Sequence, residues 1–113
     1  MTSQVCNKTE INKILDDCCK LLNDQKAEHT LCLDIIKYNG YFDYFIITTG
    51  SSKIHCRAIA KYVRELFAKS GYKEKGKPDL DSPWIILDFD ELLVHIFTQD
   101  AREYYQLEKL WAG

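Results

Sequence analysis

Two apolar runs near the C-terminal end constrain the fold more than any other feature of the chain. Residues 84–88 and 92–97 are rich in isoleucine, leucine and valine and flank a short acidic segment, which predicts two antiparallel strands joined by a tight turn. If the turn holds two residues, the alternation of side chains along a strand gives one purely aliphatic face: Ile85, Leu87, Leu92, Val94 and Ile96. The opposite face, which we call the mixed face, then carries Trp84, Ile86, Asp88, Leu93, His95 and Phe97. We expect the aliphatic face to form the core and the mixed face to be partly covered or open to a partner.

The N-terminal half predicts one helix followed by a hairpin. Apolar residues recur at helical spacing over residues 9–23, which indicates an amphipathic helix with Thr9 as its N-cap. Residues 30–36 and 44–49 are rich in β-branched and aromatic side chains and are typical of strands. Between them Asn39-Gly40 is a strong signal for a hairpin turn.

A second helix is predicted in the middle of the chain. Ser52 can cap a helix over residues 53–70, and Gly71 is expected to end it. Residues 72–75 are interpreted as a short strand, and residues 76–83 as a loop because of their glycine, proline and aspartate content.

The last segment predicts a short helix. Asp100, followed three residues later by Glu103, resembles the start of a helix with a capping box. On that helix Tyr104, Leu107 and Trp111 are expected to share one side.

Length and composition are those of one globular domain. The chain has 113 residues, 46% of them hydrophobic and 28% charged, which fits a single α/β domain over residues 1–113 with its own core. We expect a mixed sheet of about five strands packed with helices. No apolar run approaches the roughly 20 residues of a membrane span, and the first residues do not resemble a signal peptide, so a cytoplasmic protein without membrane contact is expected.

Charge is distributed unevenly along the chain. Residues 78–113 carry eight acidic side chains and two basic ones, whereas residues 53–77 carry eight basic side chains and two acidic ones. The acidic part suits a basic partner. In the second helix the spacing of four basic residues places them on one face, which we call the basic ridge and regard as a candidate RNA-facing surface: Lys53, Arg57, Lys61 and Arg64. A merely solvated surface is the alternative.

Cysteine and histidine residues do not predict a metal site. The five cysteines include no C-x-x-C pair, and a zinc site needs about four converging ligands. We therefore expect reduced thiols, no metal and no cofactor. A lone histidine on a strand, such as His95, is usually a hydrogen-bonded, half-buried residue, and no serine or cysteine is spaced to make it catalytic.

Gly50-Ser51 and the aspartates Asp88 and Asp90 suggest one enzymatic alternative. A glycine-serine turn with two aspartates is typical of nucleotidyltransferases, which use them for a triphosphate and magnesium. The two elements are far apart in the sequence, and a third strand carboxylate is missing. We therefore favour ordinary turn residues over an active site.

The two tryptophans are interpreted differently. Trp84 follows Pro83 directly after a loop and begins the mixed face, which favours partial exposure at an interface. Trp111 is assigned to the core instead.

Three segments of the chain resemble the ribosomal silencing factor (Iojap-like) family. They are DYFIITTGSS at residues 43–52, WIILD at 84–88 with VHIF at 94–97, and REYYQLEKLW at 102–111. The resemblance covers residues 11–111, and the order and spacing of all three segments agree with the family. One departure is the hairpin turn, where the family usually has Gly-Asp and this chain has Asp90-Glu91. Because aspartate tolerates a positive φ better than most residues, we expect the turn to survive.

The resemblance implies a fold related to nucleotidyltransferases but without their catalytic site, and hence a protein that is not an enzyme. It implies binding to the large ribosomal subunit through its ribosomal protein number fourteen, which blocks joining of the small subunit and represses translation when nutrients are short. The alternatives are a large-subunit assembly factor that uses the same surface and, as a remote third, a nucleotide-binding enzyme. A weak homodimer is left open.

The family pattern also assigns residues to the partner-binding site. It implies roles for Trp84, Asp88, His95, Arg102, Tyr104 and Tyr105. The mixed face adds Ile86 and Leu93, and the acidic turn adds Asp90 and Glu91 as a charged rim.

Overall fold

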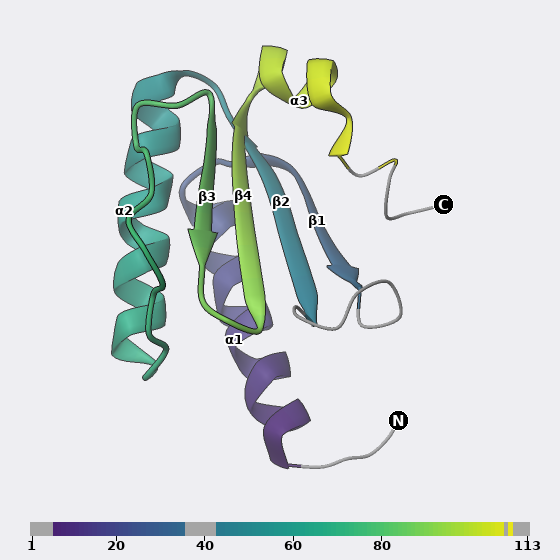
Figure 1. Ribbon diagram of the computed structural model, residues 1–113, viewed down its shortest axis with the longest axis vertical. Helices are drawn as coiled ribbons and strands as arrows, with labels where there is room; N and C mark the ends of the chain where they lie inside the picture. Colours follow the sequence, from purple (N-terminus) through teal and green to yellow (C-terminus); the bar gives the residue numbers. More distant parts are fainter. Residues whose placement is uncertain (1–5, 36–42, 108, 110–113) are drawn as a thin grey trace.

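A four-stranded sheet with three helices makes up the described part of the chain (Figure 1). The structure is a computed structural model and describes residues 6–35, 43–107 and 109. The elements follow one another as α1 (Cys6–Asp24), β1 (Glu28–Asp34), β2 (Tyr44–Gly50), α2 (Lys53–Lys69), β3 (Trp84–Asp88), β4 (Leu92–Thr98) and α3 (Gln99–Tyr105). The predicted hairpin turn at Asn39-Gly40 and the residue Trp111 lie outside the described residues.

The prediction of about five strands is wrong by one. Within the described residues, the expected strand at 72–75 contributes only an isolated bridge between Lys75 and Asp88. The start of this segment is held at α2, where Tyr72 packs edge-on against Phe67 with ring centroids 5.4 Å apart, and only Lys75 reaches the end of β3.

The sheet has the strand order β1-β2-β4-β3. Strands β2 and β4 are parallel, and the other two pairs are antiparallel. A parallel pair needs a long crossover connection, and α2 lies within the segment that joins β2 to β4. The β3–β4 hairpin pairs Trp84 with Phe97 and Asp88 with Leu93, which confirms the register expected for a two-residue turn.

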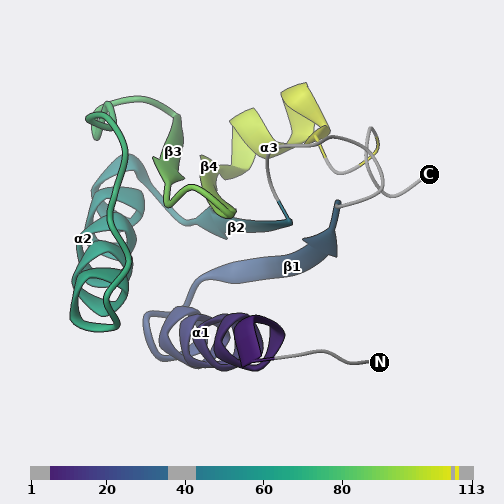
Figure 2. The same ribbon diagram turned by 60° about the horizontal axis from the view of Figure 1, so that its bottom comes forward.

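The three helices lie on opposite sides of the sheet. Figure 2 shows α1 and α2 on one side and the short α3 on the other. The aliphatic face of the hairpin points toward α1 and α2, and its five members are fully buried as predicted: Ile85, Leu87, Leu92, Val94 and Ile96. Leu22 of α1 and Ile59, Val63 and Phe67 of α2 complete this main core. The mixed face consequently points away from the two long helices.

Helix α2 begins and ends where the sequence predicts. The Ser52 hydroxyl accepts a hydrogen bond from the backbone N–H of His55, 3.0 Å away, and caps the first turn. After the helix, Gly71 has φ +89°, a left-handed conformation that suits glycine. Both predictions are confirmed.

The predicted starts of α1 and α3 are wrong. Helix α1 begins at Cys6, so Thr9 lies inside it, and neither proline nor glycine precedes Thr9 to interrupt the helix. Helix α3 is capped by Thr98, whose hydroxyl accepts from the N–H of Ala101 at 3.3 Å, and Asp100 lies in the first turn. Thr98 ends β4 in an extended conformation, with φ −69° and ψ 162°, which is the geometry that an N-cap requires.

The expected shared side of Tyr104 and Leu107 is also wrong. Gln106 adopts a left-handed conformation with φ +48°, which ends the helix between the two residues. Tyr104 is therefore 80% exposed, while Leu107 is buried against the sheet.

Candidate functional site

The mixed face is a sheet surface that α3 covers at one end only. A second, smaller core lies on this face and extends from α3 along the central strands: it contains Ile35, Phe45, Ile47, Phe97, Ala101 and Leu107. The face is more exposed on its two edge strands, where Ile86 of β3 is 41% exposed and Leu31 of β1 is 39% exposed. In the sheet register the buried residues Ile47 of β2 and His95 of β4 lie between them, and Leu33 and Leu93 of the next row are partly buried. Large aliphatic side chains on one open sheet face are typical of a site that contacts another macromolecule.

Trp84 lies where the buried and open parts of this face meet. Its ring stacks on Phe97 with centroids 5.0 Å apart and leans on Tyr105 of α3 at 4.8 Å. The backbone before it is held as well, because the Trp84 N–H donates to the Ser82 hydroxyl at 3.1 Å. Trp84 is half-buried, which agrees with the partial exposure predicted from its position after Pro83.

His95 lies beneath Trp84 and is 3% exposed. The indole N–H of Trp84 donates to Nδ1 of His95 at 3.0 Å. Burial lowers the pKa of His95 to about 4, because a charged imidazolium would lose its hydration there. The ring is therefore neutral at neutral pH. The sequence indicated a half-buried, hydrogen-bonded histidine, and the structure buries it further.

The acidic turn lies at the far end of the hairpin. The Asp88 carboxylate accepts from the N–H of Asp90 at 2.9 Å, so it stabilises the turn itself. Asp90 has φ +76°, which confirms that this aspartate takes the positive φ that the turn needs. Its carboxylate pairs with Lys75 at 2.9 Å and raises the pKa of that lysine. Glu91 is exposed beside it.

Arg102 of α3 is buried, unlike its neighbours Tyr104 and Tyr105. Its Nη1 donates to the Thr49 hydroxyl of β2 at 2.8 Å. Ala101 and Arg102 form the side of α3 that faces the sheet, and the two tyrosines lie toward solvent. Arg102 thus fixes α3 to the sheet, while Tyr104 and Tyr105 are accessible.

The structure brings most of the predicted site residues onto one surface. Trp84 contacts both His95 and Tyr105. The surface continues toward the turn through Ile86, Asp88 and Leu93. Sequence reasoning missed Leu31, Leu33 and Phe45, which extend the same face across β1 and β2. Their alternation along those strands is the signal that would have found them.

The nucleotidyltransferase alternative does not fit this geometry. Gly50 pairs with Thr98, whereas Asp88 pairs with Leu93. Those two partners are five residues apart on β4, or about 17 Å at roughly 3.3 Å per residue. Ser51 is also engaged locally, since its N–H donates to Nδ1 of His55 at 2.8 Å. The glycine-serine turn and the aspartates therefore lie at opposite ends of the sheet and cannot share one nucleotide.

Comparison with protein families decides the class of protein. Residues 8–113 match the family described as "Ribosomal silencing factor during starvation". The chain belongs to the ribosomal silencing factor family. The ribosomal silencing factor RsfS of Bacillus subtilis is 35% identical over 106 residues, which are 93% of this chain and 87% of that protein. RsfS of Haemophilus influenzae is 37% identical over 94 residues, which are 80% of this chain and 90% of that protein.

A solved structure supports the fold of this silencing factor. The crystal structure of a protein from Chromobacterium violaceum superposes with a TM-score of 0.85 at 29% identity, and the match covers 91% of this chain and 87% of the other. Together with the family match, this confirms the α/β fold. The family match and the RsfS relatives confirm the prediction of a ribosomal silencing factor, a class of protein that is not enzymatic.

The basic ridge of this silencing factor is partly neutralised. Arg57 forms an ion pair with Asp81, and Nε of Arg64 donates to Glu74 at 2.7 Å. Both acidic partners belong to the loop before Trp84, so the two arginines hold that loop against α2. Lys53 and Lys61 are exposed.

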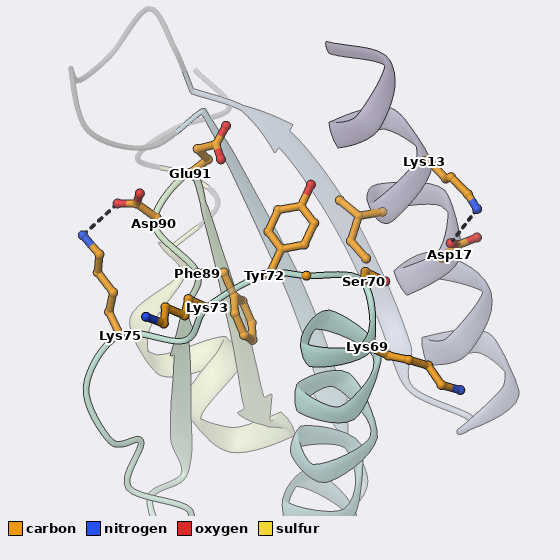
Figure 3. A pocket seen from close by; sticks show the side chains of 12 residues that line it. Lys13, Asp17, Lys69, Ser70, Tyr72, Lys73, Lys75, Phe89, Asp90 and Glu91 are labelled. Atoms are coloured by element: carbon orange, nitrogen blue, oxygen red, sulfur yellow. Dashed lines mark ion pairs between the residues drawn. The ribbon is translucent and has the colours of Figure 1, made fainter. Parts of the chain in front are cut away.

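A hollow of about 850 Å³ lies away from the mixed face of the silencing factor (Figure 3). It is bounded by α1, the end of α2 and the β3–β4 turn, and its floor includes Ile14, Tyr72 and Phe89. Two ion pairs lie among its lining residues, Lys75 with Asp90 and Lys13 with Asp17, the latter at 3.9 Å. This hollow shares only the turn residues with the candidate site.

Two thiols of the silencing factor have strongly raised pKa values. Burial raises the pKa of Cys18 to about 12, and partial burial raises the pKa of Cys32 to about 11, so both thiols are protonated at neutral pH and less nucleophilic than a free cysteine. Within the described residues, no group of three or more His, Cys, Asp or Glu side chains could hold a metal ion. No helix in the same part of the chain is long and apolar enough to cross a membrane.

Proposed function

We propose that this silencing factor binds the large ribosomal subunit through its ribosomal protein number fourteen, and that the bound protein prevents the small subunit from joining. Translation would then be repressed when nutrients are short, as the family's description, silencing during starvation, suggests. We further propose that the protein acts in the cytoplasm and needs no nucleotide or other cofactor.

The observation that carries the proposal is the open mixed face with its acidic border. A standard interface buries about 800 Å² on each partner and combines an apolar centre with a polar rim. Ile86, Leu93 and the half-buried Trp84 supply such a centre, and Asp90 and Glu91 supply carboxylates at its edge. A basic ribosomal protein is complementary to this arrangement.

The ten residues assigned to the site differ in whether they are accessible or buried. Direct contacts are proposed for the accessible ones: Trp84, Ile86, Leu93, Tyr104 and Tyr105, with Asp88, Asp90 and Glu91 at the acidic end. His95 and Arg102 are buried, so we propose that they support the contact residues from below.

Contact with ribosomal RNA is proposed for the basic ridge. Lys53 and Lys61 are the cations most available to phosphate groups, because Arg57 and Arg64 are already paired with acids. Binding through phosphate contacts weakens as salt rises. The salt dependence of binding by a Lys53→Gln, Lys61→Gln variant therefore tests this contact.

Sedimentation with purified ribosomal subunits tests the docking proposal. The protein should travel with the large subunit and not with the small one, and should be crosslinked to ribosomal protein number fourteen. Sedimentation of the free protein also shows whether the weak homodimer that the sequence analysis left open forms. Binding only to immature large particles, and not to mature subunits, would instead support the assembly role. A lack of binding to every large particle would contradict both roles.

A further inference from the structure

The bond between Trp84 and His95 uses the only polar atom that the indole has. The indole Nε1–H can donate but cannot accept. Here it donates to Nδ1 of His95 at 3.0 Å, with the two ring centroids 5.8 Å apart. Because Nδ1 accepts this bond, the neutral imidazole carries its proton on Nε2.

His95 has almost no surface to offer a partner. It lies in the middle of β4, between Ile47 of β2 and Ile86 of β3. Its ring packs edge-on against Phe45 with centroids 4.7 Å apart and runs nearly parallel to Phe97 at 6.3 Å. With 3% of the residue exposed, direct contact with another macromolecule is negligible.

Packing alone does not account for an imidazole at this position. Its Nε2 finds no hydrogen-bond partner among the described residues. A buried donor left unpaired is destabilising, whereas an apolar ring of similar shape would fill the same space without that penalty. The group that distinguishes imidazole from such a ring is the Nδ1 acceptor, and its observed partner is Trp84.

We propose that His95 is a positioning residue for docking, which holds the Trp84 indole so that its carbon surface, and not its N–H, meets the partner. The proposal rests on the docking role proposed above and specifies its chemistry. The partner group against Trp84 should be an aliphatic chain or the stem of a lysine or arginine, because such groups pack on a ring and need no donor from it. Asp90 and Glu91 lie at the far end of the hairpin from Trp84, so they do not select between these two kinds of group.

Exchange of the indole N–H in the unaltered protein is the first test. Nuclear magnetic resonance resolves one indole N–H signal for each tryptophan, and a Trp84→Phe variant identifies which signal belongs to Trp84. The proposal predicts slow exchange with solvent for Trp84 in the free protein and an unchanged bond in the complex with the large subunit. An N–H that exchanges as fast as a free indole would overturn the proposal, whether or not the protein binds ribosomes.

A double-mutant cycle on binding is the second test. His95→Phe keeps a ring but removes the acceptor, and we expect about tenfold weaker binding to the large subunit, as loss of one hydrogen bond commonly causes. In the Trp84→Phe background the same substitution should change the affinity for the large subunit by less than about twofold, because there is no indole left to position. His95→Asn, which restores an acceptor near Nδ1, should recover part of the affinity.

The outcomes are separable. Equal losses in both backgrounds, or no rescue by asparagine, would show that His95 acts otherwise and would overturn the positioning role. Failure of the parent protein to bind the large subunit would refute the proposed function but would leave the exchange measurement as an independent test of the Trp84–His95 bond.

Discussion

Nη1 of Arg102 donates a hydrogen bond to the hydroxyl oxygen of Thr49, 2.8 Å away and shielded from solvent. This bond joins α3 to β2, which is one of the two central strands of the sheet. Because α3 also carries Tyr104 and Tyr105, the bond determines where these accessible aromatics lie relative to Trp84.

Thr49→Val should lower the free energy of unfolding by about 1–3 kcal/mol, because valine keeps the shape of threonine but leaves a buried donor of Arg102 without this acceptor. Urea denaturation measures the change. Arg57→Met is the matched control, since it breaks an exposed ion pair with Asp81 and should cost less than about 1 kcal/mol. Equal effects of the two substitutions would contradict the structural role given to the buried bond.

Trp84→Ala should leave the protein folded and weaken binding to the large subunit by about 2 kcal/mol or more, as truncation of a central interface aromatic commonly does. Co-sedimentation over a range of protein concentrations measures the loss. Tyr62→Ala is a suitable control, because Tyr62 is a partly exposed aromatic on α2, away from the mixed face. An equal loss for Tyr62→Ala, or none for Trp84→Ala, would contradict the interface assignment.

Neutralising the turn with Asp90→Asn and Glu91→Gln should mainly slow association and reduce its salt dependence, because exposed rim charges steer the encounter more than they hold the complex. Asparagine also tolerates the positive φ found at Asp90, so the turn should keep its shape. Stopped-flow rates at two salt concentrations provide the measurement. Glu65→Gln on α2 serves as the control, and an unchanged association rate for the double variant would refute steering.

Burial of His95 predicts a dependence of stability on pH. Its pKa is lowered in the folded protein from 6.5 to about 4, so between these values the unfolded chain binds more protons than the folded one. The contribution of His95 to the free energy of unfolding is therefore fully present above pH 6.5. It decreases as the pH falls from 6.5 to 4 and is constant below pH 4. At about 1.4 kcal/mol per pKa unit, the loss is of the order of 3 kcal/mol.

The comparison of the parent with His95→Phe isolates this contribution from that of the carboxylates. On going from pH 7 to pH 5, the urea midpoint of unfolding should decrease more for the parent than for the variant. Parallel curves for the two proteins would mean that His95 is not held neutral by the fold.

The sequence predicts those features that depend on local geometry. The alternation of side chains along residues 84–97 assigns both faces of the hairpin correctly, because the pleat repeats every two residues and a two-residue turn fixes the register. The Ser52 cap and the glycine end of α2 are likewise set by the residues beside them.

The features that the sequence does not predict depend on residues distant along the chain. The burial of Arg102 results from Thr49, which lies 53 positions away, and the pairing of Arg57 results from Asp81, 24 positions away. The bond from Trp84 to His95 requires both the register and two particular side-chain orientations. Residues 72–75 form only one bridge to the sheet, and Tyr72 and Glu74 of this segment contact Phe67 and Arg64 of α2 instead.

The order in which the protein meets the ribosomal subunits tests the central claim most directly. Added to separated subunits, the protein should prevent their joining; added to joined ribosomes, it should separate them slowly or not at all, because its docking surface on the large subunit is then covered by the small subunit. Neither result should require ATP, since the glycine-serine turn and the aspartates lie at opposite ends of the sheet. Gradient profiles of the two orders of addition give the answer. Equal potency in both orders, or a strict requirement for ATP, would contradict steric blocking by this protein.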